Sequence, residues 1–214
     1  MGALQSEWVM KWLRGIAVAL ASLAGPALAD PVNVFQINPN GAFLRTSGEY
    51  ALAAPLVIDL QALGNGPGDV LHLKLRGDMA LTVFADVDPF NAQDIFDFVG
   101  GVFSSSATLL GADQLNRVAG AIGTGLPALS SDPTLMGNLP TDIAEDFQIL
   151  DTYVYLPAAA RYLFVAVSDI FYSDNIDPDQ DLALEVSIPE PATASVLAGL
   201  AFALLMRRRI HARG

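Results

Sequence analysis

One acidic segment, residues 168–181 (SDIFYSDNIDPDQD), has the residue types that could bind a metal ion, and it lies between two apolar runs. Carboxylates this close repel one another unless a cation neutralises them. Calcium suits such a segment, because it takes about six to eight oxygen ligands and tolerates irregular loops. The sequence therefore predicts a Ca2+ site with these ligands: Asp169, Asp174, Asn175, Asp177 and Asp179.

This segment is not an EF-hand loop. Counted from Asn175, Gln180 occupies the place where that loop needs glycine, and Val186 the place where it needs a bidentate glutamate. The alternative to a metal site is a solvated acidic loop that keeps an exported protein soluble.

Groups suited to catalysis are few. His72 is flanked by Lys74 and Arg76 in an alternating run, which favours a surface histidine over a member of a catalytic triad. The chain has no cysteine, so thiolate metal sites and disulfides are excluded. We therefore predict a protein that is not an enzyme. The alternative is a surface glycosidase that uses paired carboxylates, either Glu145 with Asp146 or Asp86 with Asp88.

The charge of the chain is concentrated in its middle. Residues 30–188 hold 21 acidic and 5 basic side chains, a net charge of −16, whereas the whole chain has −12. This balance argues against a nucleic-acid partner. With 214 residues, 52% of them hydrophobic, the chain is long enough to form one domain with a substantial core.

The N-terminus is typical of a secretory signal peptide. Lys11 and Arg14 precede a short apolar run, residues 15–24, and small side chains follow at Ala27 and Ala29. We expect cleavage after Ala29 and a mature chain that begins at Asp30. The alternative is an N-terminal buried helix.

The C-terminus combines a proline motif, an apolar stretch and a basic cluster. Pro189, Glu190 and Pro191 precede residues 192–206, which are apolar, and the stretch is closed by Arg207, Arg208 and Arg209. An apolar helix over 192–206 would be short for a bilayer, so the arginines would have to reach the interface. Arginines retained in the cytoplasm place the domain outside.

These three parts, in this order at the end of the chain, resemble the PEP-CTERM sorting domain. The resemblance implies recognition by an exosortase-type sorting protease, which cuts near the P-E-P motif and passes the protein toward the cell surface or the extracellular matrix. The alternative is a simple membrane anchor. Either way, we expect anchoring in the inner membrane with the domain in the periplasm.

The exported segment, residues 30–188, has the pattern of an all-β fold. Leucines alternate with basic residues in Val70–Arg76, a similar alternation recurs over 182–188, and Tyr162–Val167 is continuously apolar, as in a central strand. Further strands are predicted over 56–60, 79–84 and 152–156. Glycine-rich turns between them favour two packed antiparallel sheets, a β-sandwich.

Residues 100–150 are rich in Gly, Ser and Pro and only weakly periodic. Their large apolar side chains, among them Phe103, Val118 and Phe147, predict that the segment packs against the domain. Asp142 and Glu145 have the spacing of a capping box, which predicts a short helix. Loops of this length are often binding loops.

The middle domain also resembles the calcium-dependent galactose-binding lectins of the PA-I type. The stretches 67–70 (PGDV) and 162–175 (YLFVAVSDIFYSDN) are similar to the strand entry and calcium loop of that family. The resemblance implies a jelly-roll or galactose-binding-like sandwich with calcium ligands at Asp169, Asp174 and Asn175. It also implies that the calcium holds the loop and directly coordinates sugar hydroxyls, so a polysaccharide is the expected partner.

The sequence thus predicts three parts: a signal peptide (1–29), an exported β-sandwich domain (30–188) and a sorting tail (189–214). The predicted function is that of a calcium-stabilised, glycan-binding protein of the cell surface or matrix. The alternatives are a structural matrix protein without a ligand, and the glycosidase.

Overall fold

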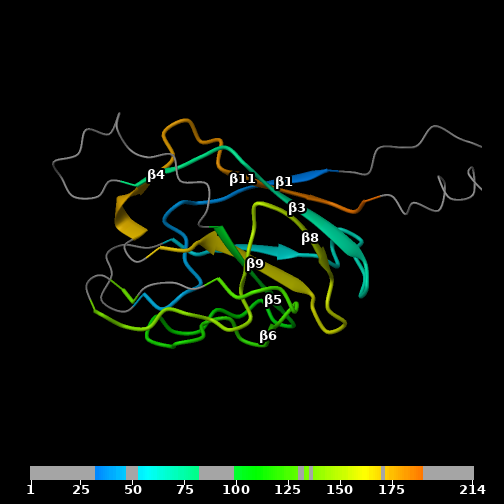
Figure 1. The fold of residues 1–214 in the computed structure, drawn as a ribbon, viewed down its shortest axis with the longest axis horizontal. Helices are drawn as coiled ribbons and strands as arrows, with labels where there is room; N and C mark the ends of the chain where they lie inside the picture. The colour runs from blue at the N-terminus through cyan, green and yellow to red at the C-terminus, as the bar shows by residue number, and fades with distance from the viewer. Residues whose placement is uncertain are drawn as a thin grey trace, which may run out of the picture. The chain divides into compact units, whose positions relative to one another are not determined.

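The computed structural model describes residues 32–46, 53–81, 99–129, 133–134, 137–169 and 172–189, and Figure 1 shows its ribbon. These residues form β-strands joined by turns, with one 3-10 helix, η2 (Tyr172–Asp174), and no α-helix among them. The prediction of an all-β domain with antiparallel sheets is confirmed for these residues.

The first sheet has four antiparallel strands, in the spatial order β1 (Asn33–Gln36), β11 (Ala183–Ser187), β3 (Val70–Arg76) and β8 (Asp151–Tyr155). The predicted alternation is present in β3, where Leu71 and Leu73 are buried and Lys74 is exposed. One face of this sheet is therefore covered, and the other is open to solvent.

The second sheet has the spatial order β2 (Leu56–Asp59), β9 (Tyr162–Val167), β5 (Val99–Ser104) and β6 (Ala121–Ile122). A fifth strand, β7 (Phe147–Gln148), pairs with the start of β5. A separate antiparallel pair is formed by β4 (Ala80–Leu81) and β10 (Asn175–Ile176).

The two sheets share one hydrophobic core. In it Leu73 of β3 and Leu184 of β11 belong to the same buried cluster as Val165 of β9 and Phe103 of β5. In Figure 1 the labels of the first sheet lie above those of β9, β5 and β6. Burial of these apolar side chains is the main favourable contribution to the free energy of folding.

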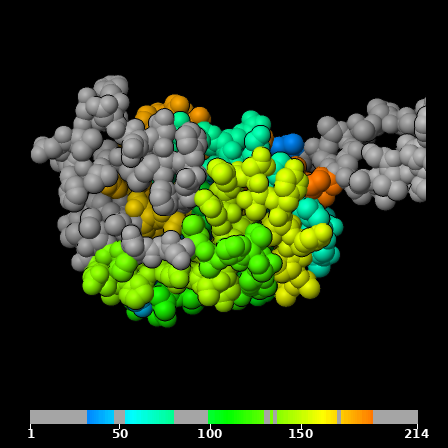
Figure 2. Space-filling view, in the orientation of Figure 1, coloured from blue at the N-terminus to red at the C-terminus, as the bar shows by residue number. Residues whose placement is uncertain are grey.

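A second buried cluster covers the other face of the second sheet. Phe164 of β9 and Val102 of β5 pack in it with Phe43, Leu44 and Ile143. The covering chain is tied down by Arg117, whose Nη1 donates a hydrogen bond of 2.9 Å to the carbonyl of Leu44. Figure 2 shows the green and yellow-green atoms of the 100–150 region along the lower side of the molecule. The prediction that this region packs is confirmed.

Several predicted elements need correction. The prediction of a helix with a capping box at Asp142 and Glu145 is wrong. Ala144 and Glu145 lie in a turn, in which the N–H of Asp146 donates a hydrogen bond to the carbonyl of Ile143. Within 182–188 only Ala183–Ser187 is a strand. By alternation Ala183 belongs to the outward-facing set, yet it is buried. The reason is that its register partners, Gln36 and Arg76, have much larger side chains.

Both ends of the chain lie outside the described residues, apart from Pro189. This applies to the predicted cleavage site at Ala27 and Ala29, to the rest of the sorting motif and to the predicted apolar helix over 192–206. Within the described ranges, no helix has the length and apolarity to cross a membrane.

Candidate functional site

The acidic segment is folded into short elements that connect the two sheets. It leaves β9 after Val167, forms η2 and β10, and returns to the first sheet at Ala183. Its described residues therefore form more than a simple hairpin loop.

Asn175 is a buried link between β10 and the turn that follows β1. Its side chain is 2% exposed, and its Nδ2 donates a hydrogen bond of 2.9 Å to the carbonyl of Pro39. In return, Nδ2 of Asn40 donates to the backbone carbonyls of Asn175, at 3.0 Å, and of Tyr172, at 2.5 Å. These reciprocal bonds hold the end of η2 against the turn at residues 38–40.

Asp177 closes the last turn of the segment. Its Oδ1 accepts the N–H of Asp181 at 3.3 Å, and its Oδ2 accepts the N–H of Leu182 at 3.2 Å. A carboxylate that accepts two backbone N–H groups in this way fixes a turn. Asp177 therefore orients the residues that enter β11.

Three carboxylates do converge, but only one of them is among the predicted ligands. One oxygen each of Asp78, Asp179 and Asp181 lies within 4.8 Å of the others. We call this group the acidic junction. Asp78 is half-buried, whereas Asp179 and Asp181 are exposed. Within the described residues, Asp169, Asp174 and Asp177 belong to no such group of three.

The pairing of β3 with β11 creates the acidic junction. Arg76 is the register partner of Ala183, so the residues just after β3 meet those just before β11. A hydrogen bond of 3.1 Å from the N–H of Asp78 to Oδ1 of Asp181 joins the two segments. The group could be found in the sequence only by pairing these two alternating runs.

Gly77 permits the close approach at the acidic junction. Its φ is +68°, and a Cβ there would lie 2.3 Å from the Asp181 carbonyl oxygen and 2.1 Å from its Oδ1. Any other side chain would collide with the backbone at this point. Gln180, between the two exposed carboxylates, also has a positive φ of 59°. A non-glycine residue adopts that conformation at a cost of about 1–2 kcal/mol, so the turn is constrained on both sides.

The acidic junction has the chemistry of a hard-cation site. Three carboxylates supply oxygen ligands, and the exposure of two of them leaves room for water to complete the shell that calcium prefers. Without a counter-ion their mutual repulsion opposes the pairing of β3 with β11.

Glu145 and Asp146 are one of the two carboxylate pairs that the glycosidase alternative would use. Asp146 is 2% exposed and its Oδ1 accepts the N–H of Leu129 at 2.6 Å. Burial raises the pKa of Asp146 to about 7, although the bond from Leu129 opposes the shift and the neighbouring Asp142 and Glu145 add to it. Oε2 of Glu145 accepts a bond from Asn116. Asp86 and Asp88 lie outside the described residues.

Comparisons with known proteins add no further evidence about this site. The chain matches no family model, no curated protein and no solved structure.

Proposed function

We propose that this chain is an exported, non-enzymatic β-sandwich protein of the cell surface or extracellular matrix, stabilised by calcium and able to bind glycan. The observation that carries the proposal is the acidic junction, where Asp78, Asp179 and Asp181 converge beside a glycine that no other residue could replace. The shared core of the two antiparallel sheets supports the sandwich architecture.

The exported location is supported by the two ends of the sequence. The cleavage site at Ala27 and Ala29 favours passage through the inner membrane, and the P-E-P motif with its arginine cluster favours an exosortase-type sorting protease as a partner. In that compartment calcium is abundant, and extracellular modules bind it with dissociation constants of about 0.1–1 mM.

The calcium ligands of this proposal differ from those expected from the sequence. Asp179 is retained, Asp78 and Asp181 are added, and Asp177 acts through the turn that it closes. A bound cation would neutralise the repulsion between the three carboxylates and so strengthen the contact between β3 and β11.

Thermal unfolding in 10 mM calcium and in excess chelator tests this proposal. With a dissociation constant of about 0.1–1 mM, this concentration is about 10 to 100 times higher and adds about 1.4–2.7 kcal/mol to the free energy of unfolding, which raises Tm by several degrees. We expect the shift to disappear in Asp179→Asn and to persist in Asp113→Asn, an exposed carboxylate elsewhere in the domain. Equal Tm values with calcium and with chelator would contradict the calcium proposal.

A second pair of variants distinguishes the two ligand sets. Loss of the calcium shift in Asp169→Asn and Asp174→Asn, but not in Asp179→Asn, would place the ion among the ligands that the lectin resemblance implies. Magnesium serves as the control ion, because it gives up its water ligands reluctantly and should bridge the three carboxylates less well than calcium.

A further inference from the structure

The open face of the first sheet presents aromatic rings to solvent. Tyr153 and Tyr155 of β8 are 59% and 73% exposed, while Val154 between them is buried. Side chains two residues apart on a strand share a face and lie about 7 Å apart. We call the surface of β11, β3 and β8 on this side of the sheet the tyrosine face; it comprises Val70, His72, Lys74, Arg76, Asp151, Tyr153, Tyr155, Ala183, Glu185 and Ser187.

One of these rings is held in a fixed plane. Tyr153 is the register partner of His72, and the two rings stack with centroids 4.2 Å apart and planes within 3°. Nε2 of His72 lies 2.5 Å from Oδ1 of Asp151, which orients the imidazole from its edge. A preformed flat surface loses little conformational entropy when a ligand covers it.

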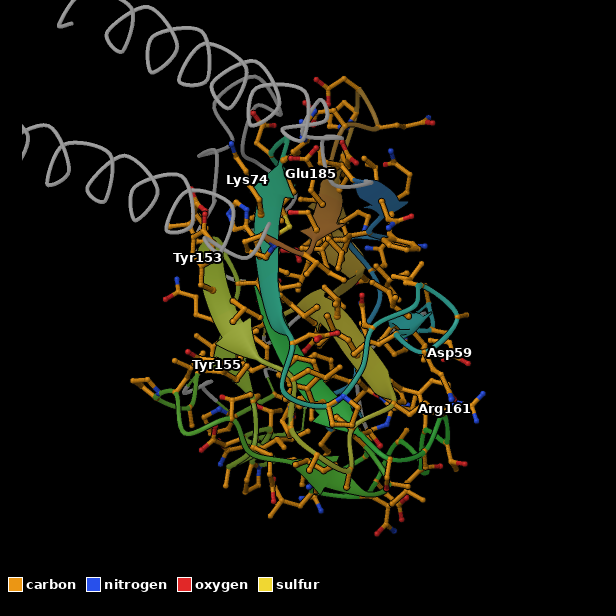
Figure 3. The ribbon with its side chains drawn as sticks, turned by 90° about the vertical axis from the view of Figure 1, so that its right-hand side faces the viewer. Asp59, Lys74, Tyr153, Tyr155, Arg161 and Glu185 are labelled. Atoms are coloured by element: carbon orange, nitrogen blue, oxygen red, sulfur yellow. The ribbon has the colours of Figure 1, made fainter. Side chains whose placement is uncertain are left out.

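The charges of the tyrosine face balance one another. Lys74 and Arg76 stand beside Glu185 and Asp151, and Arg76 forms an ion pair with Glu185. The two cationic side chains, Lys74 and Arg76, are thus matched in number by the two carboxylates, in a segment whose net charge is −16. This surface offers hydrogen-bond donors and acceptors together, which suits the hydroxyl groups of an uncharged ligand. Figure 3 shows Lys74, Tyr153 and Glu185 beside one another, with Tyr155 further along β8.

The distribution of apolar atoms argues against a protein partner. Val70, the register partner of Tyr155, is half-buried, and the exposed Val34 of β1 is separated from β8 by Glu185 and Lys74. Protein interfaces usually have a contiguous apolar centre that excludes water. Here, separate rings alternate with charged groups.

We propose that the tyrosine face binds a neutral polysaccharide chain. The Tyr153–His72 stack and the Tyr155 ring receive the C–H faces of successive sugar rings, and Asp151 and Lys74 bond to their hydroxyl groups. The inference rests on the proposed location at the cell surface or in the matrix, but it uses neither the acidic junction nor a cation. Sugar binding by this face is therefore independent of calcium.

The test is affinity electrophoresis of the full-length chain, in a detergent without a sugar head group, through gels that contain hydroxyethyl cellulose, xyloglucan, galactomannan or dextran. We expect at least one polymer to retard the chain equally in calcium and in chelator. Tyr155→Ala and Tyr153→Ala should each weaken binding by about fivefold to tenfold, the effect of one lost stacking contact. Tyr155→Phe should retain most of the affinity, and Leu110→Ala, an exposed apolar residue elsewhere, should bind like the native chain.

Three results would overturn this inference: no retardation by any of the four polymers, retardation that the tyrosine variants leave unchanged, or a dimer that Tyr155→Ala converts to a monomer. Retardation that needs calcium and Asp179, but neither tyrosine, would overturn the inference and leave the proposed function in place. Tyrosine-dependent retardation without any calcium shift in Tm would support this inference and contradict the calcium part of the proposed function.

Discussion

The outer faces of the two sheets differ in what covers them. The outer face of the second sheet is buried under the cluster of Phe43, Leu44 and Ile143, so β9 has buried side chains on both faces. The outer face of the first sheet is open, and its side chains are charged or aromatic. The contrast follows the sequences of the central strands, because YLFVAV is apolar throughout whereas VLHLKLR alternates.

This difference separates stability from binding. Side chains on the covered face of the second sheet should contribute mainly to the free energy of unfolding, since they have no contact with solvent. Tyr153 and Tyr155 on the tyrosine face are exposed, so their substitution should change binding and leave folding almost unchanged. Four substitutions test this division, from the largest expected effect to the smallest.

Phe164→Ala should have the largest effect. Phe164 is fully buried in the cluster between β9 and the covering chain. Truncation of such a ring leaves a cavity, and the free energy of unfolding should fall by about 3–5 kcal/mol. Urea unfolding followed by circular dichroism measures the change. A loss below about 1 kcal/mol would mean that the cover is not tightly packed.

Asp146→Asn should change the pH dependence of stability. The pKa of Asp146 is raised from 3.8 to about 7, so the folded state favours the protonated carboxyl. The stability that this group contributes is complete below about pH 4 and is lost as the pH rises through about 7. Asparagine imitates the protonated form, and we expect it to stabilise the chain at pH 8 by about 2–4 kcal/mol.

The measurement for Asp146 compares unfolding free energies at pH 5 and pH 8. This range avoids Asp59 and Asp151, whose pKa values are lowered from 3.8, mainly by hydrogen bonds to Arg161 and His72 respectively. The native chain should lose stability between pH 5 and pH 8, and the variant should lose less. Equal losses in both proteins would show that Asp146 does not titrate in this range.

Gly101→Ala tests how closely the second sheet is packed. A Cβ at residue 101 of β5 would lie 2.8 Å from Cδ1 of Ile149 and 3.0 Å from Cζ of Phe147. Both contacts are too short, so we expect a loss of about 1–3 kcal/mol. Gly123→Ala is the matched control, because nothing lies within 4 Å of the corresponding Cβ. Similar unfolding curves for the two variants would contradict close packing around β5.

Tyr155→Ala should have the smallest effect on stability and serves as the counterpart of Phe164→Ala. Its ring is 73% exposed, so the free energy of unfolding should change by less than about 0.5 kcal/mol. The same variant should lose polysaccharide binding. If it unfolds much more easily than the native chain, the tyrosine face has a structural role and the division between the sheets fails.

The elements that the sequence predicts well are those with a strong local pattern. Val70–Arg76 and Tyr162–Val167 are strands with the predicted bounds. Alternation predicts a strand with one buried face, and a continuous apolar run predicts a strand that is buried on both faces. The predicted strand 56–60 corresponds to β2, and 152–156 to β8, with small shifts at the ends. Of 79–84, only β4 lies within the described residues.

Five of the described strands were not predicted, because their local signal is weak: β1, β5, β6, β7 and β10. β5 contains Gly100 and Gly101, which are poor strand formers, yet it pairs with three other strands. Its glycines leave room for Phe43 and Phe147 on opposite faces, a need that only the packed neighbours reveal. β1, with four residues, is too short to show a period.

The sequence by itself thus determined the all-β class, the two central strands and the acidic character of the 168–181 segment, since composition and alternation act over a few residues. Only the tertiary structure decided which carboxylates meet. Asp78 and Asp181 are 103 residues apart and are joined by the register of β3 with β11. The His72–Tyr153 stack likewise depends on the pairing of β3 with β8. Such contacts are set by strand pairing across the whole chain, and no local pattern encodes them.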